Sequence, residues 1–190
     1  SAASDVYKRQ ILMAGRFNRK RGAGIPHAYW IGVVSITVAT TVTLGWMLLS
    51  GLVFWRGESL VPIGGMIIGN AMNAVSLALN RLRSEVDQRE ELLLAMLALG
   101  ANHRQAMRNL YSMVVRSALI PTIDSLKSVG MIHIPGITAG MILAGMAPLA
   151  AVSMQLVVMV MLTASVTLSV STAVLLAAPR ALVFSQRIEG

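Results

Sequence analysis

The feature that most constrains this chain is a long stretch without charge, because no Asp, Glu, Lys or Arg occurs between Lys127 and Arg180. One membrane crossing needs about 20 apolar residues, so this stretch has room for two. The whole chain fits such an environment, with 55% hydrophobic and 13% charged residues and a mean hydropathy of +0.69. Soluble domains carry about 25% charged residues. The sequence therefore predicts an all-α, polytopic integral membrane protein.

The positive charge is placed as in membrane proteins. The chain holds 16 Lys and Arg against 8 Asp and Glu, a net charge of +8. These basic residues cluster at the ends of apolar runs, which is typical of cytoplasmic loops and argues against a nucleic-acid partner. We expect both ends of this chain to be cytoplasmic. Residues 1–10 lack periodicity and follow no start Met, so we interpret them as a possible non-native leader before a single membrane domain at 11–190.

Four spans follow from the apolar runs. Trp30 precedes the first span, and Trp46 and Trp55 lie towards its other end, as interfacial anchors do. Pro135 and Gly136 interrupt the third span and predict a broken or kinked helix there. The predicted spans are 31–54, 61–79, 129–147 and 150–178.

A polar face within the second span is the first candidate site. Met66, Asn70 and Asn73 recur at i, i+4 and i+7, so they share one face of a helix. This face is either a helix-packing stripe or part of a permeation path lined by amide oxygens and thioethers. His133 is either a hydrogen-bonded structural residue or a metal contact. The candidate path residues are Asn70, Asn73 and His133, with Met66, Met72 and Met131 as weaker candidates.

The region 80–127 predicts a cytoplasmic pair of amphipathic helices. Leu92, Met96 and Leu99 repeat at helical spacing, and Leu99-Gly100-Ala101-Asn102 is typical of a helix stop followed by a new N-cap. Arg104 and Arg108 lie on one face of the second helix. Three interpretations remain open: a docking surface for a partner, a solvated charged face, or attachment to the membrane surface.

A proline and two charges follow this pair. Pro121 is expected to break or kink the helix that reaches it. Asp124 and Lys127 are one turn apart and are expected to pair at the membrane edge, where they would pass motion to the third span. On this hypothesis Asp124→Asn impairs transport and leaves membrane insertion intact; unchanged transport would exclude that role.

Several chemistries have no basis in the sequence. It contains no cysteine, no phosphate-binding GxxxxGK[ST] loop and no HExxH motif, so a thiolate metal site, an HExxH zinc site and an ATP-binding P-loop are excluded, and metal binding by this chain stays unknown. No convincing catalytic set can be assembled from its residues. The chain is therefore expected to be a transport subunit or a membrane scaffold without a substrate path; an intramembrane enzyme is the weakest alternative.

Three stretches resemble the permease subunits of Fet-type iron-export ABC transporters, a family of the bacterial inner membrane that is related to plant permeases linked to aluminium tolerance. In the third stretch, Pro121, Asp124, Lys127, Pro135 and Gly136 fall where the family pattern has them. The stretches are VPIGGMIIGNAMNAVSLAL (61–79), LALGANHRQA (97–106) and ALIPTIDSLKSVGMIHIPGITAGMILAGMAP (118–148). The resemblance runs from about Ile11 to the C-terminus and implies that the chain lacks earlier spans.

This resemblance implies a homodimeric permease that exports iron, driven by a separate ABC ATP-binding subunit, and that contributes to resistance to metal or oxidative stress. No cofactor is then expected on this chain, with ATP bound by the partner and membrane lipid around the spans. The helices around Gly100 resemble the coupling region of ABC permeases. They depart from the EAA-G pattern of importers, because Leu94 stands where that pattern has Glu.

Overall fold

The computed structural model describes residues 1–190 except 1–4, 7, 15–26, 52–56, 130–135 and 186–190. Every regular element in the described ranges is a helix, which confirms the predicted all-α fold. A helical segment at 8–14 comes first. The labelled helices are α2 (Ala28–Leu49), α3 (Gly57–Gln88), α4 (Glu90–Ala98), α5 (His103–Val129), α6 (Gly136–Leu143) and α7 (Pro148–Ser185).

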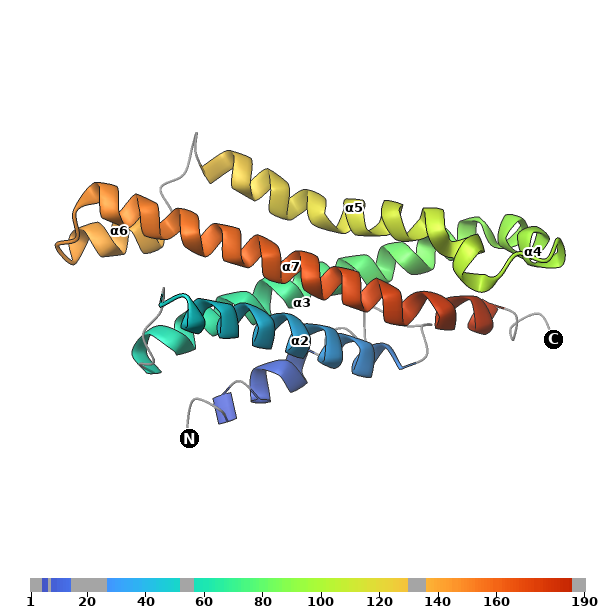
Figure 1. Ribbon diagram of the computed structural model, residues 1–190, viewed down its shortest axis with the longest axis horizontal. Helices are drawn as coiled ribbons and strands as arrows, with labels where there is room; N and C mark the ends of the chain where they lie inside the picture. Colours follow the sequence, from blue (N-terminus) through green and yellow to red (C-terminus); the bar gives the residue numbers. More distant parts are fainter. Residues whose placement is uncertain (1–4, 7, 15–26, 52–56, 130–135, 186–190) are drawn as a thin grey trace.

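Four long helices lie side by side and alternate in direction along the chain (Figure 1). Helices α2 and α5 run one way, and α3 and α7 run the other way. Helix α7 is central, because it contacts α2, α3, α5 and α6. The short helix α4 lies at one end of the bundle and α6 lies at the opposite end. The chain therefore forms an up-down-up-down bundle with a short helix at each end.

Small side chains hold this bundle together. In lipid, helices associate through close packing rather than through the hydrophobic effect, so small residues are favoured where helices meet. Helices α3 and α7 both follow this rule, with buried positions recurring at helical spacing. The buried residues are Ala71, Ala74, Val75, Ala78 and Leu79 of α3, and Val166, Val170, Ala173, Val174 and Ala177 of α7.

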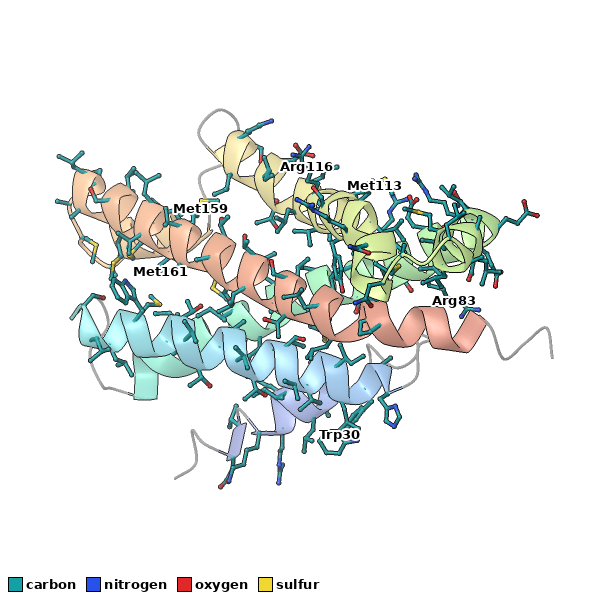
Figure 2. All side chains as sticks on the ribbon, turned by 45° about the vertical axis from the view of Figure 1, so that its right-hand side comes forward. Trp30, Arg83, Met113, Arg116, Met159 and Met161 are labelled. Atoms are coloured by element: carbon teal, nitrogen blue, oxygen red, sulfur yellow. The ribbon has the colours of Figure 1, made fainter. Side chains whose placement is uncertain are left out.

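The outer face of α2 has the character of a lipid-facing surface. Exposed Val34, Val38 and Val42 form a stripe at four-residue spacing. Trp30 and Trp46 flank this stripe and are 61% and 63% exposed, about 24 Å apart along the helix axis. Figure 2 shows Trp30 on the opposite side of the bundle from Arg116 of α5. These two indoles suit the anchoring role that the sequence predicts for them; Trp55 lies outside the described residues.

The predicted stop and restart around Gly100 is confirmed. Gly100 adopts a left-handed backbone with φ 89°. The N–H of Gly100 donates to the Leu97 carbonyl, and that of Ala101 donates to the Met96 carbonyl, each at 3.0 Å, which is a Schellman ending. Gln105 Oε1 then accepts from the Asn102 N–H at 2.9 Å, as in a capping box. The turn between α4 and α5 is thus specified by its own residues.

The third predicted span, 129–147, stays a prediction, because its residues 130–135, including the predicted interruption at Pro135, lie outside the described residues. The helical residues that the structure describes in this span are Val129 of α5 and the 8 residues of α6, Gly136–Leu143. Among the described helices, three are both long and apolar enough to cross a bilayer: Ala28–Leu49, Ile63–Gln88 and Pro148–Pro179. These helices overlap the first, second and fourth predicted spans.

The predicted coupling region 80–127 is packed into the bundle, and its cytoplasmic location stays a prediction. Helix α5, which is 27 residues long, continues through Pro121 and packs along both α3 and α7. Its buried stripe explains this, since Met107, Leu110, Val114 and Ala118 are all buried against the core. Packing on both flanks compensates for the single backbone hydrogen bond that a proline removes. Pro121 therefore does not end the helix.

The expected apolar face of α4 is shifted by about one residue, and of its three predicted members only Met96 packs against the core. Leu92 is 58% and Leu99 is 88% exposed, whereas the neighbouring Leu93 is buried. Met96 and Leu97 are partly buried against the core. This short helix has apolar residues on more than one side, so the spacing alone does not determine which side is buried. Contact of α4 with α5 and α3 buries the side that carries Leu93.

The expected pairing of Asp124 with Lys127 is absent. Both side chains are exposed, and no ion pair joins them in the described structure. Because both project outwards from α5, neither is driven towards the other by burial. By contrast, Glu85 and Arg89, one turn apart near the end of α3, form an ion pair at 3.1 Å.

Candidate functional site

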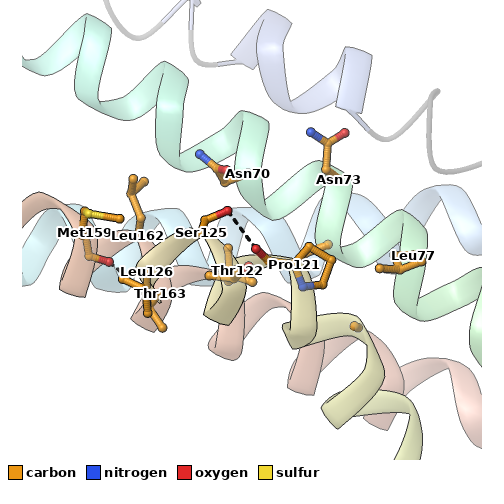
Figure 3. Close-up of a pocket in the computed structure, with 13 residues that line it drawn as sticks. Asn70, Asn73, Leu77, Pro121, Thr122, Ser125, Leu126, Met159, Leu162 and Thr163 are labelled. Carbon is orange, nitrogen blue, oxygen red and sulfur yellow. Dashed lines mark hydrogen bonds between the residues drawn. The ribbon is translucent and has the colours of Figure 1, made fainter. Parts of the chain in front are cut away.

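A cavity of about 260 Å³ lies where α3, α5 and α7 meet (Figure 3). Each helix contributes polar and apolar groups to its wall. The lining is Asn70, Asn73, Ala74 and Leu77 of α3, Ala118, Pro121, Thr122, Ser125 and Leu126 of α5, and Met159, Leu162, Thr163 and Val166 of α7.

The register of each helix explains which side chains reach the cavity. On α3, Asn70 and Asn73 are exposed beside the buried Ala71 and Ala74, so packing of the small residues leaves the amides at the helix margin. On α5, Ala118, Thr122 and Ser125 follow one another at successive turns of the same face. The cavity is thus a product of three helices and of no single motif.

The hydroxyls that line the cavity use their hydrogens within their own helices. Ser125 Oγ donates to the Pro121 carbonyl at 2.8 Å, the hydrogen bond drawn in Figure 3. Thr163 Oγ1 donates to the Met159 carbonyl at 2.9 Å. Asn70 Nδ2 likewise donates to the Met66 carbonyl at 2.9 Å. Ser125 and Thr163 therefore retain oxygen lone pairs for a guest, and Asn70 retains its Oδ1 acceptor and one Nδ2 hydrogen.

Such a lining suits an electropositive guest. Amide and hydroxyl oxygens are ligands for hard cations or for the water around them, and the thioether of Met159 adds a softer donor. The described residues contain no group of three or more His, Cys, Asp or Glu side chains that could hold a metal ion. The lining is accordingly mixed, with amide, hydroxyl and thioether groups among apolar side chains and no carboxylate or thiolate cage.

The structure brings together only part of the predicted site. Asn70, Asn73 and Pro121 meet at the cavity. Met66 is half-buried and contributes its carbonyl to Asn70, and Met72 packs against the core. Gly100, Arg104 and Arg108 lie at the α4 end, Gly136 is the first residue of α6, and His133, Met131 and Pro135 fall outside the described residues.

Sequence reasoning missed four of the polar or sulfur-bearing lining residues. Thr122 and Ser125 lie next to Pro121 and Asp124, and the charge and the proline drew the interpretation away from them. Met159 and Thr163 are i and i+4 on α7, within a run of many similar hydroxyls and methionines. The i, i+4, i+7 spacing of Ala118, Thr122 and Ser125 is the signal that identifies the α5 contribution.

Three helices that are long and apolar enough to cross a membrane define the class as a polytopic helical membrane protein. The chain belongs to the family described as "Uncharacterised protein family (UPF0014)", which matches residues 6–182.

Curated relatives come from bacteria and plants. The chain is 39% identical to the "Probable iron export permease protein FetB" of Escherichia coli over 151 residues, 80% of this chain and 58% of the relative. It is 32% identical to "Protein ALUMINUM SENSITIVE 3" of Arabidopsis thaliana, over 92% of this chain and 64% of the relative. It is 34% identical to the "UPF0014 membrane protein YjkA" of Bacillus subtilis, over 79% of this chain and 60% of the relative. The chain thus spans about six-tenths of these relatives' length, and no solved structure matches it significantly.

Proposed function

We propose that this chain is part of the permease subunit of an ABC transporter that exports iron or another metal ion, driven by a separate ATP-binding subunit. The observation that carries the proposal is the acceptor-rich cavity among α3, α5 and α7, in a chain 39% identical to a relative named as a probable iron export permease. Oxygen acceptors within a helical bundle offer a cation or its hydration water an alternative to bulk solvent.

The charge distribution supports a bacterial inner-membrane location with both ends of this chain cytoplasmic. If α5 crosses the bilayer as the third of four long helices, the start of α2, the ends of α3 and α7, and α4 all lie on one side. Arg81, Arg83, Arg89 and Arg108 gather at this end. Positive loops mark the cytoplasmic side. The ATP-binding subunit would then dock at this end, around α4 and the turn at Gly100.

Export by the full-length protein with its ATP-binding partner tests this function directly. Cells that express both subunits should hold less iron than cells with either subunit alone. The matched variants are Thr163→Val and Thr167→Val, because both hydroxyls donate to a backbone carbonyl at 2.8–2.9 Å but only Thr163 lines this cavity. Loss of one acceptor, about 1 kcal/mol, should lower export about fivefold for Thr163→Val and leave Thr167→Val near wild type.

Two outcomes would contradict the proposal. Equal export by the two variants would remove the cavity from the path. Unchanged iron content, together with ATP hydrolysis by the partner that does not respond to this chain, would favour the membrane scaffold instead.

A further inference from the structure

The outward face of α5 is polar along most of its length. Its exposed residues repeat every three or four positions, the spacing at which one helix presents a seam to another. Figure 2 shows Arg116 on this outer side, and a groove of about 420 Å³ runs beside it. The seam consists of Asn109, Ser112, Arg116, Ile120, Ile123 and Lys127, all exposed.

Lys127 of this seam and Asp124 beside it lie at the depth of the membrane spans. Leu126 lines the same cavity as Thr163, and Thr163 lies well inside the span Pro148–Pro179. Asp124 and Lys127 are within two residues of Leu126, which is about 3 Å along the helix axis. The same level includes Asn70 and Asn73, inside the span Ile63–Gln88.

Exposed charges at this depth need protein or water beside them, because a charged side chain facing hydrocarbon is costly. Asp124 and Lys127 do not satisfy one another, since no ion pair joins them in the described structure. The α2 stripe of Val34, Val38 and Val42 shows the contrasting apolar surface that lipid can cover.

We propose that this face of α5 is the contact surface for a second copy of this chain. Opposite charges three residues apart make the face complementary to itself across a two-fold axis along the membrane normal. Asp124 of each copy then pairs with Lys127 of the other, and Ile120 and Ile123 of both copies pack around the axis. A homodimer is what the family resemblance implies, and the inference adds the face and the residue pairs that would make its contact. It does not depend on the cavity being the substrate path.

Cysteine cross-linking in native membranes tests this contact, and the chain has no cysteine of its own. Ile123→Cys, placed at the axis, should form a disulfide-linked dimer rapidly under mild oxidation. Val38→Cys is the matched control, because Val38 is also an exposed β-branched residue near the middle of a long helix. It should yield only trace dimer.

Charge reversal in the Ile123→Cys background then tests the pairs. Asp124→Lys or Lys127→Asp alone should lower the rate of dimer cross-linking at least about tenfold, as expected when two intermolecular contacts are lost in lipid. The double reversal should restore it, and the amount of each variant in the membrane checks its folding. Equal cross-linking at Val38 and Ile123, no effect of either reversal, or fast labelling of Ile123→Cys by a membrane-impermeant thiol reagent without dimer would each overturn the proposal.

Discussion

Helices α5 and α7 lie side by side and line the same cavity, yet they present opposite surfaces to their surroundings. Helix α7 carries no charge before Arg180, and its outward Val152, Leu156 and Val160 are exposed apolar residues. Helix α5 carries three Arg, one Asp and one Lys within 27 residues. The difference teaches that a helix joins this bundle through its buried stripe, whereas its outer face selects lipid or protein as its neighbour.

The largest expected effect comes from placing a charge on each outer face. Leu156→Lys on α7 should cost about 2.5–3.5 kcal/mol, the cost of a lysine facing lipid near a span centre. Ser112→Lys on α5 should cost less than about 1 kcal/mol, because this face is already polar. The measurement is the membrane-inserted fraction of each variant. An equal decrease in the inserted fraction of the two variants would mean that the outer faces of α5 and α7 both contact lipid.

A smaller effect is expected at the turns that precede the two helices. Gly100 before α5 and Gly145 before α7 have φ of 89° and 91°, and nothing lies within 4 Å of a Cβ added to either. Gly→Ala should therefore cost about 1–2 kcal/mol at each, from the left-handed backbone alone. Thermal unfolding in detergent measures this loss. If the ATP-binding partner docks at the α4 end, Gly100→Ala should also reduce the stimulation of its ATP hydrolysis, and Gly145→Ala should not. A reduction with Gly145→Ala alone would place the partner at the α6 end.

The smallest effects concern one serine on each helix. Ser165 of α7 is fully buried, and its Oγ has no hydrogen-bond partner in the described structure. Ser165→Ala should stabilise the protein by up to about 1 kcal/mol, because it removes an unpaired polar group. Ser117 Oγ of α5 donates to the Val114 carbonyl at 3.0 Å, so Ser117→Ala should be neutral or cost about 0.5 kcal/mol. Denaturant unfolding distinguishes the signs, and a loss at Ser165 would indicate a partner for its hydroxyl.

The long apolar runs allow the sequence to predict α2, α3 and α7, because a charge-free segment has few alternatives to a membrane helix. Helix α5 could not be recognised in this way. Its charges hide the stripe of Met107, Leu110, Val114 and Ala118 that binds it to the bundle. Pro121 also led the sequence prediction to place a break or kink within this helix. In the structure the helix continues past Pro121, packed against α3 and α7.

The candidate site was partly predictable for a similar reason. Asn70 and Asn73 stand out as amides within an apolar run, so the sequence identifies them. Their neighbours Ser125 and Thr163 are common residues that matter only through the register of α5 and α7 against α3. That register depends on which small residues meet across helices, and a single sequence does not contain it.

The hydroxyls of α7 have a consequence for movement. Ser153, Thr163, Thr167, Ser169 and Thr172 each donate to a carbonyl of α7 itself, at 2.8–2.9 Å. A shift of α7 along its neighbours would therefore leave these five hydrogen bonds unbroken. Its contacts with α3 are made by small apolar side chains, which can exchange partners over short sliding distances. Sliding of α7 along α3 would thus keep these hydroxyls satisfied, whereas Gln155, which accepts from Thr138 of α6 at 3.4 Å, ties the start of α7 to α6.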